Sequence, residues 1–219
     1  MNFPDSLAVD SQGDVFVANM HNSTVEKFSA SGTLLQTLSN GVGYPNSVAV
    51  DGQGDVFVAN QSYYSNNETL VSPDIEEFSA NGILLRTLSN GVNNPSCLAV
   101  DDQGDVFVAS SDNHYMNSTV EEFSANGTLL RTLSTGLADP SSVAVDSHGD
   151  VFVANFLNGP VEEFSANGSL LQTLSTGANS YLHSLVLDSH GDVFVANTGN
   201  NTVEEFGVQL LGVSPPAAL

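Results

Sequence analysis

One ten-residue phrase recurs five times along this chain, and the repetition limits the possible folds more than any other feature. The phrase Asp-x-x-Gly-Asp-Val-Phe-Val-Ala-Asn, or its variant ending in Ser, begins at Asp10, Asp51, Asp101, Asp146 and Asp188. Successive copies are separated by 41, 50, 45 and 42 residues. Periods of this size are typical of repeat architectures in which each unit buries its faces against its neighbours.

Each copy contains four short apolar segments that have the character of β-strands. They are rich in Val, Phe, Leu and Thr and end at Gly, Asn, Asp or Pro, as strands do. In the fourth copy the segments are 142–146, 150–155, 161–164 and 170–175. The Asp-x-x-Gly-Asp and Ala-Asn-Gly sequences between them predict tight turns, because Gly readily adopts the positive φ that such turns require. Each copy is therefore predicted to be an antiparallel meander of four strands, a to d, without helix.

The Val-Phe-Val-Ala segment is apolar on both faces, so strand b must be covered on both sides. Four-stranded units that are each buried between two neighbours describe a β-propeller. A flat β-solenoid is the alternative, although its repeats are generally shorter. The predicted fold is all-β, a β-propeller of four-stranded antiparallel blades, with five blades for the five repeats.

The repeats resemble NHL repeats, whose blade has a Pro lead-in, an apolar strand ending in Asp, a Gly turn and a strand ending in Phe. In the second copy these elements are Pro45, 48–51, Gly54-Asp55, 56–60, Phe78 and Gly82. The resemblance covers residues 4 to about 213 and implies a propeller. It implies no single activity, because the NHL family includes enzymes, nucleic-acid binders and protein-binding scaffolds.

The repeats divide the chain into one propeller, residues 1–213, and a short tail. The expected blades span about 4–40, 45–90, 95–135, 140–176 and 182–213. Residues 214–219 follow the last strand with two prolines and are expected to be disordered. The first and fifth blades are expected to close the ring by packing face to face. The alternative is a fragment of a larger propeller, since the NHL family more often closes six blades.

The charge of the chain restricts its partners. It has 25 acidic and three basic residues, a formal net charge of −22, which disfavours nucleic acid and anionic membranes. No apolar run approaches the roughly 18 residues of a membrane span, so no membrane insertion is expected. The single Cys97 excludes an internal disulfide. The many Asn, Ser and Thr residues and the few Lys favour an extracellular or cell-surface location, and the protein is expected to be a monomer.

The b–c and d–a loops vary most among the copies and are predicted to share one face of the propeller. Loops on a rigid scaffold are where binding sites usually lie. Aromatic side chains with Asn and Ser suit carbohydrate or protein ligands, because they combine flat apolar area with hydrogen-bonding edges. The alternative is that exposed loops simply vary without function. The candidate ligand-binding residues are Tyr44, Tyr63, Tyr64, His114, Tyr115, Phe156 and Tyr181.

A second candidate site is the mouth of the central channel, where the residue before each strand a is polar. These residues are Asp5, Asn46, Ser96, Ser141 and His183. The simplest interpretation is a polar plug that holds water, without any cofactor. The alternative is a metal site in which Asp5, Asn46 and His183 bind one Ca²⁺ or Zn²⁺.

The 183–185 segment His-Ser-Leu also resembles the lead-in of amidoglycolate-lyase propellers. Zinc-dependent lyase chemistry would need comparable histidines on two further blades, and the other copies lack them. An enzyme needs different residues in distinct roles, whereas these copies are nearly alike. The sequence therefore favours a binding scaffold for a protein or glycan over a catalytic protein. A metal-assisted lactonase or lyase at the channel mouth remains the alternative function.

Overall fold

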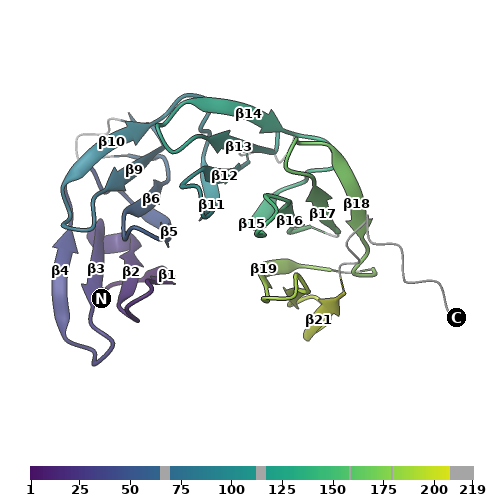
Figure 1. Cartoon of the computed structure of the whole chain (residues 1–219), viewed down its shortest axis with the longest axis horizontal. Coiled ribbons are helices and arrows are strands. Elements are labelled where there is room, and N and C mark those ends of the chain that lie inside the picture. Colours follow the sequence, from purple (N-terminus) through teal and green to yellow (C-terminus); the bar gives the residue numbers. More distant parts are fainter. Residues whose placement is uncertain (65–69, 112–116, 158, 179, 208–219) are drawn as a thin grey trace, which may run out of the picture.

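A computed structural model describes residues 1–64, 70–111, 117–157, 159–178 and 180–207. Its strands form five antiparallel sheets arranged around one axis, a five-bladed β-propeller, as the repeats predict (Figure 1). Blade 1 consists of β1 (Pro4–Val9), β2 (Val15–Asn19), β3 (Thr24–Phe28) and β4 (Leu34–Leu38), with a 3₁₀ turn, η1 (Met20–Asn22), after β2. Blade 2 consists of β5 (Pro45–Val50), β6 (Val56–Asn60), β9 (Asp74–Phe78) and β10 (Leu84–Leu88), and the separate hairpin of β7 (Tyr63–Tyr64) and β8 (Leu70–Val71) lies between β6 and β9.

The remaining blades follow the same order. Blade 3 consists of β11 (Pro95–Val100), β12 (Val106–Ser110), β13 (Thr119–Phe123) and β14 (Leu129–Leu133). Blade 4 consists of β15 (Pro140–Val145), β16 (Val151–Asn155), β17 (Val161–Phe164) and β18 (Leu170–Leu174). Blade 5 has β19 (Leu182–Leu187), β20 (Val193–Asn197) and β21 (Thr202–Phe206). The strand d expected within 208–213 and the tail 214–219 lie outside the described residues.

The repeated Asp-x-x-Gly-Asp sequence forms the turn between strands a and b. In blade 1, Asp10 Oδ1 accepts hydrogen bonds from the backbone N–H groups of Gln12 and Asp14, each at 2.9 Å. Gly13 in the same turn has a φ of +80°, a conformation that L residues rarely adopt. The first Asp of each phrase therefore has a structural role, which explains why the acidic motif accompanies every blade.

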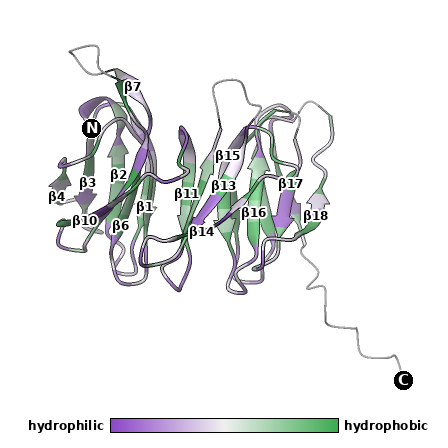
Figure 2. Ribbon diagram, turned by 90° about the horizontal axis from the view of Figure 1, so that it is seen from above, coloured by the Kyte–Doolittle hydropathy of each residue, from purple (hydrophilic) through white to green (hydrophobic). Residues whose placement is uncertain are grey.

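The core lies between blades. One face of each blade presents small and medium side chains around a Phe, and the facing blade presents two Val of strand b around another Phe. Between blades 1 and 2 the buried partners are Phe16, Ala18, Val25 and Leu38 on one side and Val48, Val56, Val58 and Phe78 on the other. Equivalent clusters fill the next three boundaries. Strand b of blades 2 to 4 is thus covered on both faces, as its continuous apolar sequence predicts, and Figure 2 shows the strands of the blades coloured largely as hydrophobic.

The expected packing of blade 1 on blade 5 is not observed, and the two ends of the array stay apart (Figure 1). Leu7 of β1 is 68% exposed, whereas Val48 at the same position of blade 2 is 4% exposed. Val203 of β21 is 73% exposed, whereas its counterpart Val161 in blade 4 is fully buried. The end blades therefore each leave uncovered a face that is buried in the interior blades.

Among the described residues, no helix is long and apolar enough to cross a membrane.

Candidate functional site

Five backbone hydrogen bonds hold the loops on one side of the propeller, which we call the loop face. In each blade, the residue after strand b donates its N–H to the carbonyl oxygen of the residue before strand a. The acceptors are Phe3, Tyr44, Asn94, Asp139 and Tyr181. The segments that enter a blade and leave its strand b are therefore side by side, and their side chains share one surface.

The asparagines at the ends of strand b brace the same loops. Asn60 Oδ1 accepts the N–H of Gly43 at 3.0 Å, and Asn155 Oδ1 accepts the N–H of Ala138 at 2.8 Å. Asn60 is 3% exposed and Asn155 is fully buried. These amides therefore fix the loops of the loop face.

Four aromatic rings form a row across the loop face of blades 1 and 2, which we call the aromatic shelf. Phe3 stacks on His21 with ring centroids 4.6 Å apart, and Tyr44 stacks on Tyr63 at 4.9 Å. His21 and Tyr44 join the two pairs at 6.3 Å. Phe3 is 55% exposed and Tyr44 is 38% exposed. Figure 2 shows the N-terminus and β7 on the same side of the molecule.

The backbone holds two of these rings in an unfavourable conformation. Phe3 and Tyr44 have φ values of +54° and +51°, in the left-handed region. In blades 3 and 4 the same position is occupied by Asn94 and Asp139, residue types that tolerate this region. The fold thus accepts small polar residues at this position. The aromatic residues in blades 1 and 2 cost conformational energy that packing in the core does not explain.

Gly43 makes room for one ring of the shelf. A Cβ atom at this position would lie 2.8 Å from Cε1 of Tyr63, closer than atoms can approach without displacement. Gly43 does not have a positive φ, so its backbone conformation does not itself require glycine. The missing side chain is therefore needed for the ring of Tyr63 to lie against the loop.

A second aromatic group lies on blades 4 and 5. Phe156 packs on Tyr181 at 5.6 Å and edge-on against His183 at 4.9 Å. Tyr181 is 39% exposed, and a β-bridge joins it to Leu157. This group contains two of the residues predicted as ligand-binding and brings His183 beside them.

The structure therefore brings Tyr44 together with Tyr63, and Phe156 with Tyr181. His114, Tyr115 and the side chain of Tyr64 lie outside the described residues. Phe3 and His21 are not among the residues that the sequence predicts as ligand-binding. An alignment of the repeats contains the signal for Phe3, because it occupies the position of Tyr44 directly before the proline of strand a.

The predicted channel-mouth residues link neighbouring blades. Asn46 Nδ2 donates to the carbonyl oxygen of Pro95 at 2.6 Å, and Ser96 Oγ donates to that of Pro140 at 2.5 Å. Ser141 Oγ donates to the carbonyl of Leu182, the first residue of the next strand a, at 2.6 Å. In blades 2 to 4 the predicted channel-mouth residue is thus the second residue of strand a, not the residue before the strand, and its side chain bonds to the start of the following blade.

The serine one residue further along forms a second set of links, which runs in the opposite direction. Ser6 Oγ accepts the N–H of Val48 at 3.2 Å, and Ser142 Oγ accepts the N–H of Leu185 at 3.1 Å. Ser47 accepts the N–H of Leu98 in the same manner. We call these two sets of bonds the inter-blade links.

The three proposed metal ligands have separate contacts in the structure, and a metal site formed by them stays a prediction. Among the described residues, no group of three or more His, Cys, Asp and Glu side chains is placed to hold a metal ion. Asn46 uses its amide nitrogen in the inter-blade links, and its buried Oδ1 has no hydrogen-bond partner. Partial burial raises the pKa of Asp5. His183 packs against Phe156 in the second aromatic group.

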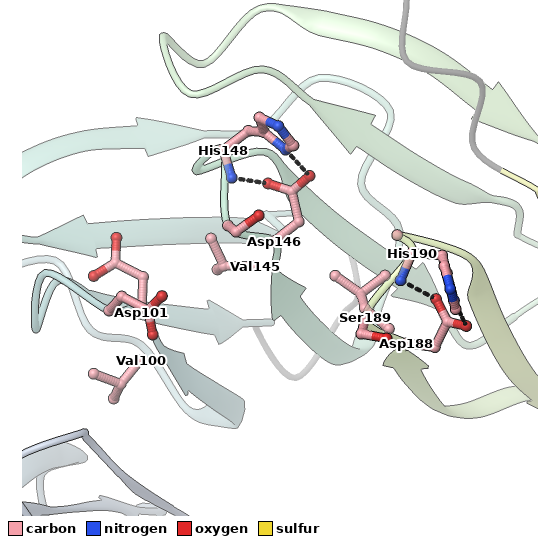
Figure 3. Close-up of a pocket in the computed structure, with 12 residues that line it drawn as sticks. Val100, Asp101, Val145, Asp146, His148, Asp188, Ser189 and His190 are labelled. Atoms are coloured by element: carbon pink, nitrogen blue, oxygen red, sulfur yellow. Dashed lines mark hydrogen bonds and ion pairs between the residues drawn. The ribbon is translucent and has the colours of Figure 1, made fainter.

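A cavity of about 540 Å³ lies on the opposite side of the propeller, among the a–b turns of blades 3 to 5 (Figure 3). His148 Nδ1 lies 3.2 Å from Asp146 Oδ2, and His190 Nδ1 lies 3.1 Å from Asp188 Oδ2. Both aspartates also accept backbone N–H groups of their own turns through Oδ1. The carboxylates of Asp146 and Asp188 are therefore committed to the turns of the repeat.

Strand c carries buried carboxylates in the body of the blades. Glu76, Glu121 and Glu162 are each at most 4% exposed. Each accepts a hydroxyl hydrogen bond, from Thr87, Ser110 and Thr173 respectively. Burial raises the pKa of all three carboxyl groups, because it disfavours the charged form more than these bonds favour it.

All three basic side chains are engaged by carboxylates. Lys27 Nζ lies 3.3 Å from Asp10 and 3.1 Å from Asp14. Arg86 pairs with Glu77 at 2.6 Å between Nε and Oε2, and Arg131 pairs with Glu122. No lysine or arginine of the chain is thus left as an unpaired cation on the surface.

No protein-family model matches this chain, and no curated protein matches its sequence. Solved structures match its fold. Kuenenia stuttgartiensis hydrazine synthase is similar over 92% of this chain and 64% of its own, with 14% identity and a TM-score of 0.76. This chain thus spans less than two thirds of the length of that structure.

Two further structures show similarity of the same kind. A nidogen/laminin complex matches over 94% of this chain and 76% of its own, with 17% identity and a TM-score of 0.71. A gluconolactonase from Xanthomonas campestris matches over 91% of this chain and 70% of its own, with 17% identity and a TM-score of 0.66. At these identities the similarity shows a β-propeller and nothing of the ligand.

Proposed function

We propose that this protein is a binding scaffold that holds a carbohydrate against the aromatic shelf of its loop face. The observation that carries the proposal is the left-handed backbone of Phe3 and Tyr44. At the same position the fold accepts Asn94 and Asp139, yet two adjacent blades use aromatic residues. Residues held in costly conformations gather at functional sites.

The chemistry of the shelf suits a sugar ring. Half-exposed aromatic faces offer flat apolar area to the C–H groups of a pyranose, while the hydroxyls of Tyr44 and Tyr63 and the imidazole of His21 offer hydrogen bonds at the edges. Aromatic rings also lose little side-chain entropy when they bind. Because every lysine and arginine is paired, the surface has little means of attracting a polyanion, so we favour a neutral glycan and expect no nucleic acid.

The proposal also covers the repeat type, the location and the oligomeric state of the protein. We assign the repeats to the NHL type, the location to the extracellular space or cell surface, and the active form to the monomer. A protein ligand is the second outcome of the binding test. The nidogen/laminin complex is a propeller structure with a protein partner, which supports propellers as binding surfaces without assigning a partner to this chain.

The test is affinity electrophoresis of the whole chain through gels that contain neutral polysaccharides, followed by titration of the one that retards it. The double variant Phe3→Asn with Tyr44→Asn should weaken that binding about 5- to 100-fold, since each aromatic contact contributes about 0.5–1.5 kcal/mol. Leu85→Asn is the matched control, because Leu85 is a 49%-exposed apolar residue of blade 2 on the outer strand β10.

The control should bind as the unaltered chain does. Equal retardation of the double variant and the unaltered chain would refute the role of the shelf. Failure of every neutral polysaccharide, together with binding of a protein that the double variant loses, would assign the shelf to a protein ligand instead.

A further inference from the structure

The boundary between neighbouring blades has a fixed chemistry that repeats along the array. On one side lie the inter-blade side chains, such as Ser96 and Ser47, which bond to the first residues of the next strand a. On the other side lie a backbone carbonyl and an N–H that receive them, as in Pro140 and Leu98. The same boundary buries an apolar cluster. We call the face of a blade that carries these side chains its giving face, and the face that carries the backbone carbonyl and N–H its receiving face.

Blade 5 presents a giving face that no described residue covers. His183 and Ser184 occupy the positions of Ser141 and Ser142 in blade 4, where both side chains bond to the next blade. Val203 is 73% exposed and Val186 is 57% exposed. Within the described residues, this end of the array carries the hydrogen-bonding and apolar groups of an interior boundary without the partner.

Blade 1 presents a receiving face that no described residue of another blade covers. Leu7 and Val9 are 68% and 56% exposed, whereas their counterparts in blade 2 are the buried Val48 and the partly buried Val50, both packed in the core between blades 1 and 2. Leu7 has the same register against β2 as Val48 has against β6, so its N–H points away from the sheet as that of Val48 does. The carbonyl of Pro4 lies where that of Pro95 accepts Asn46.

We propose that the gap between these two faces is an interaction surface for at least one further four-stranded blade of the same repeat type, supplied by polypeptide other than residues 1–219. Such a blade would accept the links of His183 and Ser184 on its receiving face. Its giving face would bond to the N–H of Leu7 and the carbonyl of Pro4. Both exposed apolar faces would be covered in the same step.

A second copy of this chain does not fit the gap. The two end faces are different halves of one boundary, so contact between copies would be head to tail. The five blades already curve most of the way around the axis, so a five-bladed copy that continued the array from blade 5 would run into blade 1 (Figure 1). An added blade can lie between the two faces, whereas a five-bladed copy that docks on one of them collides with the other.

The test measures access to the two faces with thiol reporters. Leu7→Cys and Val203→Cys are made separately in a Cys97→Ser background, which introduces the serine that the other four blades have at that position. Val48→Cys and Val161→Cys are the buried controls. The rate of reaction with a small disulfide reagent is compared between the 219-residue chain and a chain in which a copy of residues 136–175 replaces residues 214–219.

In the unextended chain both reporters should react as exposed thiols, and the buried controls should react slowly. In the extended chain the reaction at both reporters should slow at least about tenfold, because it then requires local opening. A second extended chain carries a copy of residues 91–134 of blade 3 instead, so that the test does not depend on the folding of one graft. Protection by either graft supports the proposal.

Three results would overturn it. Slow reaction of both reporters in the unextended monomer would show that the five blades close on themselves. Protection that grows with protein concentration, with a dimer in light scattering, would show that a second copy covers the faces. Unchanged reactivity with both grafts would show that these faces do not receive a blade.

Discussion

Val161 and Val203 occupy the same position of the repeat, and substituting each by Ala tests how the fold is stabilised. Val161 begins strand c of blade 4, is fully buried and belongs to the cluster between blades 4 and 5. Val203 occupies the equivalent place in blade 5 and is 73% exposed. The chemical change is identical in the two variants, so any difference reflects the neighbouring blade alone.

The expected losses of stability differ severalfold. Removing two buried carbon atoms forfeits about 1.6 kcal/mol of transfer free energy, at about 0.8 kcal/mol per carbon. A residual void of about 50 Å³ adds about 1.2 kcal/mol, so Val161→Ala should cost about 2–3 kcal/mol. Val203 retains only about a quarter of that burial, and its substitution should cost less than about 0.5 kcal/mol.

Urea unfolding followed by circular dichroism and by tyrosine fluorescence measures both values. In thermal unfolding, Val161→Ala should lower the midpoint by roughly 5–10 °C and Val203→Ala by less than about 2 °C. Equal losses for the two variants would refute the reasoning, since they would mean that Val203 is covered in solution. A loss below about 1 kcal/mol for Val161→Ala would show that the inter-blade clusters contribute less than their burial implies.

Three other predictions concern single residues. Tyr44→Asn should leave the free energy of unfolding within about 1 kcal/mol of the unaltered value, because relief of the left-handed backbone, about 1–2 kcal/mol, offsets the lost stacking, about 0.5–1.5 kcal/mol; a large loss in urea unfolding would contradict this. Asn155→Ala should cost about 2–4 kcal/mol, because the buried Asn155 amide then no longer bonds the N–H of Ala138 and the carbonyl oxygens of Gly136 and Pro160, at about 1 kcal/mol each, and amide exchange at Ala138 should accelerate. Burial raises the pKa of Glu121 above its ordinary value of 4.5, so its contribution to stability is fully present below about that pH and is lost as pH rises through the folded pKa. Glu121→Gln should therefore reduce the fall in stability between pH 4.5 and neutrality, measured as urea midpoints across that range, and an unchanged slope would contradict the assignment.

Most of the fold was predictable from the repeats, because strand patterns and turn residues act locally. The five turns at Asp-x-x-Gly-Asp and the doubly covered strand b follow from residue types within one unit. Closure of the ring was not predictable in this way. Leu7 and Val48 have equivalent positions and similar side chains, and only the presence or absence of a neighbouring blade makes one exposed and the other buried.

The candidate site was predictable in part. The variable loops indicated Tyr44 and Tyr63, but no pattern in the loops states that Phe3 and His21 complete a row with them. That row depends on a backbone conformation and on the space beside Gly43, which are properties of the folded loops. The polar residues at the channel mouth suggested a ligand site, whereas their carbonyl partners belong to the adjacent blade and become visible only in three dimensions.

The repeated boundary between blades also determines how the molecule should come apart. When each unit contacts only its neighbours, stability approximates a sum of unit terms and nearest-neighbour terms. An array with two free ends then loses its terminal units first, since each has one neighbour instead of two. Amide exchange should therefore be slowest in blade 3 and faster toward both termini. A ring without ends would remove this gradient and unfold as a single cooperative unit.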